Sequence, residues 1–320
     1  MDRIRKIAFE EHYTAPGFAE YSKAFIKHIP AELAAHLASR LTDFDETRLR
    51  EMDAAGIDYV ILSQTGPGVQ GEKDPALAQR RARENNDFLA AQVARHPDRF
   101  GGFAHLAMHD PKAAADELER AVRELGFKGA LVNGHTLGTY YDAPAYDVFW
   151  ERLQALDVPL YLHPVDPWVV PQAYDGHPEL VGATWGWGVE TATHALRLLF
   201  GGVFDRFPRV TVILGHMGEG LPFQRWRFDS RFSVYPHGVR IDRKPSEYIG
   251  SNIVITTSGV CSGATLAGAI GEMGAEAVLF SVDYPYESSE IAARFIETAP
   301  IDDATRALVC SGNAKRLFKL

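Results

Sequence analysis

The chain contains very little cysteine. Only Cys261 and Cys310 occur in 320 residues, and they lie far apart with no C-x-x-C pair. This excludes a disulfide framework and a cysteine metal knuckle, and it is typical of a protein of the reducing cytoplasm. No block of five or more basic residues occurs, and 33 Lys plus Arg against 42 Asp plus Glu give a formal net charge of -9. Such a balance argues against a nucleic-acid-binding surface.

Long apolar segments are also missing. The N-terminus enters a short strand-like run without an apolar stretch and cleavage site, so no secretory signal is expected. The uncharged stretch 249–271 is rich in Ser, Thr, Gly and Asn, which suit strand ends and loops better than lipid. No membrane span is therefore predicted. With 46% hydrophobic and 23% charged residues, the chain can nevertheless bury a sizeable core.

Short apolar or β-branched segments alternate with segments of helical spacing along the chain. The predicted strands are 7–9, 59–62, 100–106, 130–133, 160–163, 210–214, 253–257 and 277–282. The predicted helices are 74–95, 110–125, 144–155, 191–204, 287–298 and a closing helix 303–318. No internal repeat, low-complexity linker or shift in composition marks a domain boundary.

This alternation predicts an α/β fold, with residues 1–320 forming a single (β/α)8 TIM barrel. A doubly wound sheet is the alternative. The long connection 14–54 has its own Pro and aromatic residues, so it is expected to be an insertion over the barrel mouth.

Side chains that can bind a metal fall at the C-terminal ends of four predicted strands, which converge on one mouth in a barrel. Alternation along the first strand places Glu10 and His12 on the same side, where they can share a metal. His163 and Asp283 would complete a mixed nitrogen and oxygen shell suited to Zn²⁺, Mn²⁺ or a similar ion. A lone histidine is more often a surface or packing residue, but four strand ends together are harder to explain that way. The residues at these ends are Glu10, Glu11, His12, His163, His216, Glu219 and Asp283.

Six segments together resemble the amidohydrolase-related nonoxidative decarboxylases, and within them the enzymes for γ-resorcylate (2,6-dihydroxybenzoate) and 2,3-dihydroxybenzoate. These segments are 10–12, 65–70, 163–164, 188–198, 215–222 and 281–287. The resemblance spans nearly the whole chain, and it implies a metal-dependent, amidohydrolase-like barrel.

The resemblance also implies roles for particular residues. The fourth strand ends in Asn133 and His135 without a lysine, so the carbamylated lysine of binuclear relatives has no counterpart and one metal is expected. Oxygen-rich ligation favours Mn²⁺ modestly, with Zn²⁺ and Mg²⁺ left open. His216 and Glu219 are implied to form a polar pair beside the substrate. The implied metal ligands are Glu10, His12, His163 and Asp283.

The implied reaction is the reversible decarboxylation of an ortho-hydroxybenzoate such as 2,6- or 2,3-dihydroxybenzoate or salicylate. Direct loss of carbon dioxide would leave an unstabilised aryl carbanion, so the ring carbon must first be protonated, with the metal as Lewis acid and template. The resemblance favours Asp283 as the proton donor. A metal-bound carboxylate is a poor acid unless its environment raises its pKa, so His216, paired with Glu219, is the rival donor.

Contacts to the substrate ring are expected from four more residues. Arg227 lies where the family places a pocket residue and could pair with the carboxylate, although an exposed helix cation is the alternative. Phe25, Trp187 and Tyr284 are expected as ring walls, with core packing as the alternative. Phe232 stands where the resorcylate enzymes have Asn, so one ortho hydroxyl or an apolar substituent fits as well as 2,6-dihydroxybenzoate.

Two hypotheses from other classes stay open. A metal-dependent hydrolase of a lactone or amide would use the same ligands, with His216 or Asp283 activating a metal-bound water. A noncatalytic binding barrel would be expected to lack a complete ligand set. The expected partners are a small aromatic carboxylate and further copies of the chain, as a homotetramer or homodimer, without nucleic acid or membrane.

Overall fold

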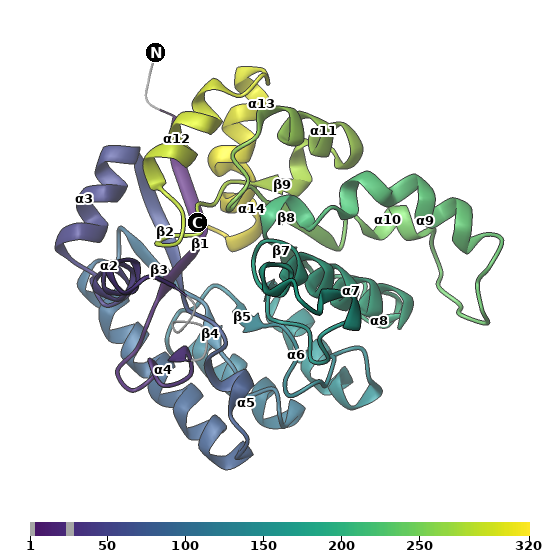
Figure 1. The fold of residues 1–320 in the computed structure, drawn as a ribbon, viewed down its shortest axis with the longest axis horizontal. Coiled ribbons are helices and arrows are strands. Elements are labelled where there is room, and N and C mark those ends of the chain that lie inside the picture. Colours follow the sequence, from purple (N-terminus) through teal and green to yellow (C-terminus); the bar gives the residue numbers. More distant parts are fainter. Residues whose placement is uncertain (1–3, 24–28) are drawn as a thin grey trace.

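The computed structural model describes residues 4–23 and 29–320 (Figure 1). A ring of strands surrounded by helices fills the centre of the molecule, as Figure 1 shows. Within the two described ranges, no helix combines the length and apolar character needed to cross a membrane. The strands, in chain order, are β1 (Lys6–Tyr13), β2 (Ile57–Gln64), β3 (Phe100–Gly102), β4 (Ala104–His105), β5 (Ala130–Asn133), β6 (Leu160–His163), β7 (Val212–Leu214), β8 (Ile253–Thr256) and β9 (Val278–Leu279).

Backbone hydrogen bonds close these strands into a barrel. β1 to β3 form one parallel sheet and β4 to β9 another, each in chain order. Residue Phe103 joins them, since its N–H donates to the β2 carbonyl of Leu62 at 2.9 Å. On the other side the N–H of Asp283 donates to the carbonyl of Glu10 at 3.0 Å, which links the last strand to the first. With β3 and β4 as halves of one strand, the eight predicted strands and the (β/α)8 barrel are confirmed.

The barrel interior is filled by apolar side chains that the strands contribute in layers. The ring of Phe318, on α14 (Asn313–Phe318), meets the ring of Phe9 edge-on with centroids 4.9 Å apart. Because Lys319 also bonds Asp157, which precedes β6, α14 covers the end of the barrel opposite the strand C-termini. The interior cluster includes Ile7, Phe9, Ile61, Phe103, Leu131, Tyr161, Ile213, Val254 and Leu279.

The outer helices begin and end where local chemistry dictates. Asp74 and Asp110 cap α4 and α5 by accepting backbone N–H groups of the first turn, and a proline follows each cap. Gly56 ends α3 in the left-handed conformation, with φ of 67°, which glycine adopts without a Cβ penalty. The helices are α2 (Ala31–Leu41), α3 (Glu46–Ala55), α4 (Pro75–Arg95), α5 (Pro111–Arg123), α6 (Asp147–Leu156), α7 (Gly186–Phe200), α8 (Val203–Arg206), α9 (Arg225–Phe232), α10 (Pro245–Tyr248), α11 (Gly263–Met273), α12 (Ser289–Thr298), α13 (Asp303–Ala307) and α14.

Several helices differ from the sequence expectation. The stretch 249–271, expected to form strand ends and loops, contains most of α11, which begins because the Ser262 hydroxyl accepts the N–H of Thr265. The closing helix 303–318 is divided by a π-helical segment, Leu308–Gly312, between α13 and α14. α9 and α10 project away from the barrel, as seen at the right of Figure 1.

The connection 14–54 contains α2 and α3. α3 packs beside α12 and leads directly into β2, as the outer helix of a barrel unit does. Its interpretation as an insertion over the mouth stays a prediction.

Candidate metal centre

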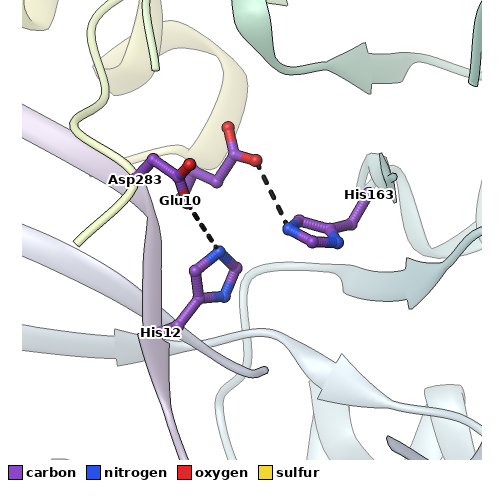
Figure 2. Close-up of side chains that lie close together, drawn as sticks. All are labelled: Glu10, His12, His163 and Asp283. Carbon is purple, nitrogen blue, oxygen red and sulfur yellow. Dashed lines mark ion pairs between the residues drawn. The ribbon is translucent and has the colours of Figure 1, made fainter. Parts of the chain in front are cut away.

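Two of the four predicted metal ligands, Glu10 and His12, lie on β1, and this strand contains a β-bulge. Between Ala8 and Glu11, β1 uses three residues where β2 uses two. Strict alternation would place Phe9 and Glu10 on opposite sides, but the extra residue turns both toward the interior. His12, two residues after Glu10, then shares its side (Figure 2).

Four side chains from distant parts of the chain meet at the mouth of the barrel (Figure 2). One ligand atom from each of Glu10, His12, His163 and Asp283 lies within 4.8 Å of the other three. His12 Nε2 is 3.2 Å from Asp283 Oδ1, and His163 Nε2 is 3.6 Å from Glu10 Oε1. The two imidazole rings meet edge-on with centroids 4.8 Å apart. The geometry brings together all four residues that the sequence analysis grouped as ligands.

In both His12 and His163, Nδ1 has a hydrogen-bond partner and Nε2 faces the centre of the four-residue cluster. His12 Nδ1 lies 3.1 Å from the Ser63 hydroxyl, and His163 Nδ1 lies 3.0 Å from the carbonyl of Pro164. A proton on each Nδ1 leaves Nε2 with its lone pair free, the tautomer that a metal ligand requires. Among the described residues, buried Glu10 Oε1 and His12 Nε2 have no hydrogen-bond partner.

This set of donors fits one divalent cation. Two imidazole nitrogens and two carboxylates form the mixed shell that Zn²⁺ or Mn²⁺ accepts. Burial raises the pKa of Glu10 and lowers the pKa of His163 well below its usual value, because both charged forms lose water there. A cation among these groups would compensate both carboxylates and keep the histidines neutral, so two unpartnered buried atoms would gain a partner.

His216 lies beside this cluster and is held by two carboxylates. Its Nδ1 is 2.8 Å from Glu219 Oε1, and its Nε2 is 3.5 Å from Asp283 Oδ2 and 3.7 Å from Glu10 Oε1. Burial by itself lowers the pKa of His216, but Glu10, Glu219 and Asp283 together raise it well above its usual value. The Asp283 carboxyl is buried too, which raises its pKa, yet the neighbouring imidazoles of His12 and His216 hold that pKa below its usual value. His216 and Asp283 therefore form a pair that can share a proton.

The backbone around this pair is strained. His216, Glu219 and Asp283 all have positive φ, at 49°, 53° and 79°. Non-glycine residues adopt this region rarely, and such conformations cluster at functional sites. Glu219 follows a short 3-10 turn in this conformation and reaches back to His216. Its alternative role, a carboxylate in the first turn of a regular helix, is thus not the one observed.

The expected ring walls lie in different places. Trp187 is in the first turn of α7, and its ring centroid lies 6.5 Å from that of His163. Its indole N–H donates to Asp166. Tyr284 instead packs below the Arg48 guanidinium, 4.5 Å from the ring centroid, which is the core-packing alternative. Phe25 lies outside the described residues.

The other predicted substrate contact lies on the projecting part of the molecule. Arg227 is exposed on α9, apart from the four ligands. Phe232, on the same helix, packs against Phe200 of α7 with ring centroids 5.3 Å apart. Phe232 therefore contributes to the contact between α9 and α7.

One aromatic residue beside the cluster was missed by the sequence analysis. The ring of Tyr286 lies 5.7 Å from that of His12, and its hydroxyl is 2.6 Å from that of Thr65. Burial raises the pKa of Tyr286 to about 12, so its hydroxyl stays protonated at neutral pH. Tyr286 belongs to the segment 281–287 that carries the family resemblance, three residues after Asp283, so its position was a usable indication.

Comparisons with known proteins agree with this arrangement. The amidohydrolase family model matches residues 27–320. The γ-resorcylate decarboxylase of Polaromonas sp. (strain JS666) is 47% identical over 330 residues, which cover 98% of each chain.

Two solved structures share the fold over almost the whole length. A 2,6-dihydroxybenzoate decarboxylase in complex with 2,6-dihydroxybenzoate has a TM-score of 0.94 at 45% identity, covering 99% of this chain and 100% of that one. A dihydroxybenzoic acid decarboxylase from Polaromonas sp. JS666, with bound manganese and the inhibitor 2-nitroresorcinol, has a TM-score of 0.94 at 47% identity and covers 99% and 98%. The chain belongs to the amidohydrolase family, and its relatives at 45–47% identity are named decarboxylases of aromatic acids.

Proposed function

We propose that the chain catalyses the metal-dependent, nonoxidative decarboxylation of an ortho-hydroxybenzoate, with 2,6-dihydroxybenzoate as the first substrate to test. The observation that carries this proposal is the convergence of Glu10, His12, His163 and Asp283 within 4.8 Å at the barrel mouth, with His216 beside Asp283. The names of relatives at 45–47% identity support the same chemistry.

Glu10, His12, His163 and Asp283 would hold one divalent ion. When bound, such an ion supplies a Lewis acid for the phenolate and one carboxylate oxygen of the substrate and fixes the ring in place. Mn²⁺ is our first choice because a structure 47% identical to this chain is described with bound manganese. Zn²⁺ and Mg²⁺ are the other ions to test.

We assign proton delivery to Asp283, with His216 as the group that resupplies it. Asp283 Oδ2 lies 3.5 Å from His216 Nε2, whose other nitrogen is held by Glu219. The raised pKa of His216 and the lowered pKa of Asp283 support a resting proton on the imidazole. Transfer from His216 to Asp283 and then to the ring carbon lets one short path serve both directions of the reaction.

Aromatic side chains around the cluster would hold the ring. Trp187 beside His163 and Tyr286 beside His12 supply flat surfaces on two sides. Phe25 remains a predicted wall and Arg227 a predicted partner for a carboxylate, whereas Tyr284 packs on Arg48 instead.

Association into a homodimer or homotetramer is also part of this proposal. Its support is the large apolar surface on the projecting part and on the loop after β6, where Trp226 is 77% exposed and Val169 is 75% exposed. A second copy of the chain would cover such surface. Size-exclusion chromatography with light scattering measures the state.

Metal analysis coupled to an assay of carbon dioxide release tests the proposal. The panel contains salicylate and the 2,3-, 2,4- and 2,6-dihydroxybenzoates, and the reverse reaction uses the matching phenol with bicarbonate. We expect about one divalent ion per chain, release from at least one ortho-hydroxybenzoate, and carboxylation of its product. Metal without release, together with hydrolysis of a lactone or amide panel, would contradict it.

A further inference from the structure

The two carboxylate oxygens of Glu10 have different surroundings. Oε1 faces His163 and His216, at 3.6 and 3.7 Å from their Nε2 atoms, and accepts no hydrogen bond among the described residues. Oε2 faces the other way and accepts hydrogen bonds from the hydroxyls of Tyr161 and Ser258. Because the Glu10 carboxylate is fully buried, these two hydrogen bonds take the place of hydrogen bonds that water would otherwise make to it.

Three hydroxyls from two strands make up this environment. Tyr161 lies on β6, while Thr256 ends β8 and Ser258 follows it two residues later. Thr256 Oγ1 is 3.1 Å from the Tyr161 hydroxyl, 2.7 Å from Ser258 Oγ and 3.5 Å from Glu10 Oε2. The three side chains are therefore one connected group, with Glu10 of β1 as its shared acceptor.

The number of hydroxyl hydrogens in this group determines whether Glu10 Oε2 can also bind a cation. Each hydroxyl has one hydrogen to donate. Tyr161 and Ser258 donate theirs to Glu10 Oε2, and Thr256 can donate to one of those two oxygens or to Oε2 itself. Two donors occupy both lone pairs of a carboxylate oxygen in the plane of the group, so Oε2 has none left for a cation.

The space around Oε2 is equally restricted. Gly215, at the end of β7, leaves just enough room for this oxygen. A Cβ at that position would lie 2.6 Å from Glu10 Oε2 and 3.0 Å from the Tyr161 hydroxyl.

Ser258 also reaches the proton-sharing pair. Its Oγ accepts the backbone N–H of His216 at 3.1 Å while its O–H donates to Glu10. His216 has positive φ, a conformation that needs support from its surroundings. One hydroxyl thus connects a predicted metal ligand to the backbone of the predicted proton carrier.

We propose that Tyr161, Thr256 and Ser258 are positioning residues that hold Glu10 so that it offers only Oε1 to the metal. This inference rests on the proposed function, because it assumes that a divalent ion binds among the four ligands. If Glu10 binds the metal through one oxygen, one coordination position of the metal stays open. Binding through both oxygens would fill that position. In a metal with six positions and four such protein ligands, two positions then remain for the two oxygens of an ortho-hydroxybenzoate.

The test is a titration of the metal-free protein with Mn²⁺ alone, followed calorimetrically, so that it does not depend on activity. Ser258→Ala and Tyr161→Phe each remove one donor to Oε2. We expect each to raise the Kd for Mn²⁺ by about 10- to 100-fold, the usual effect of losing a group that orients a metal ligand. Ser258→Thr keeps the hydroxyl, and we expect its Kd to stay within about threefold of the unaltered protein.

Tyr141→Phe is the matched control for Tyr161→Phe. Tyr141 is a buried tyrosine whose hydroxyl bonds Thr136, 2.9 Å away, outside this group. Its removal should leave the Kd for Mn²⁺ within about twofold. The visible spectrum of Co²⁺-loaded protein gives a second readout, since its band intensity follows coordination number. We expect the spectrum to change in Ser258→Ala and to stay the same in Tyr141→Phe.

The outcomes separate the inference from the proposed function. An unchanged or lower Kd in both Ser258→Ala and Tyr161→Phe overturns the positioning role while leaving the metal centre in place. If Tyr161→Phe does not fold, Ser258→Ala with its Ser258→Thr rescue decides alone. If the unaltered protein binds no Mn²⁺, Zn²⁺ or Co²⁺, the metal centre itself fails and the inference fails with it.

Discussion

Acid should destabilise this protein partly through histidines that are buried as neutral rings, and replacing His105 by Gln should remove one such contribution. His105 ends the third barrel strand and is 1% exposed. Its Nε2 accepts the N–H of Val69 at 3.0 Å, and among the described residues its Nδ1 has no partner. Burial lowers the pKa of His105 to about 3.

The sign and size of this effect on stability follow from the pKa of His105 in the unfolded and in the folded protein. The unfolded chain binds a proton on His105 below a pKa of 6.5, whereas the folded protein does not until about 3. The stabilisation is therefore complete above pH 6.5 and is lost as pH falls toward 3. A difference of roughly 3.5 pKa units corresponds to a loss of about 4 kcal/mol at pH 3, and to about 2 kcal/mol at pH 5.

Urea unfolding at pH 7.5 and pH 5.0, in the presence of a metal chelator, measures this effect. Gln can still accept the Val69 N–H but does not titrate. We expect the unaltered protein to lose about 2 kcal/mol more stability than His105→Gln between the two pH values. His237→Gln, at an exposed histidine, is the control and should behave like the unaltered protein. An equal loss in all three proteins would refute the reasoning.

Three further changes test the site itself. Asp283→Asn should abolish carbon dioxide release, because an amide cannot relay the proton, while calorimetry still detects Mn²⁺ and substrate; full activity or loss of the fold would contradict the assigned role. His12→Ala should lower the metal content below about one ion per chain, as measured by elemental analysis, and an unchanged stoichiometry would remove His12 from the ligands. Gly215→Ala should weaken Mn²⁺ binding by at least about tenfold, since its Cβ would lie 2.6 Å from Glu10 Oε2. Gly271→Ala, with nothing within 4 Å of its Cβ, should leave the Kd unchanged, and equal values for the two variants would refute the steric argument.

The barrel was predictable because its strands are local patterns of apolar and β-branched residues. Each predicted strand is present, and α4 and α5 begin at the aspartates where capping chemistry predicts a start. The helices α2, α3, α9, α10 and α11 were missed. α11 is the clearest example, since Gly and Ser within 249–271 suggested loops, yet packing against the barrel makes that segment helical after Ser262.

The metal ligands of the candidate site could be predicted from the sequence, but the aromatic residues around them were harder to predict. Glu10 and His12 were placed on one side by alternation, and they are on one side, although the bulge between Ala8 and Glu11 sets which side it is. Tyr286 was missed because its partner His12 lies more than 270 residues away in the chain. Tyr284, two residues earlier, packs on Arg48 instead, a difference of side that only the structure reveals.

The alternation of strand and helix and the placement of metal-binding side chains at strand ends are visible in the amino-acid sequence, because both depend on residues a few positions apart. The folded barrel decided how Glu10 and Asp283 meet, through a backbone hydrogen bond that joins the segment after the last strand to the first strand. It also decided which nitrogen of His12 faces the centre and which oxygen of Glu10 stays free. These features depend on distances between segments far apart in the chain, and those distances exist only once the barrel has closed.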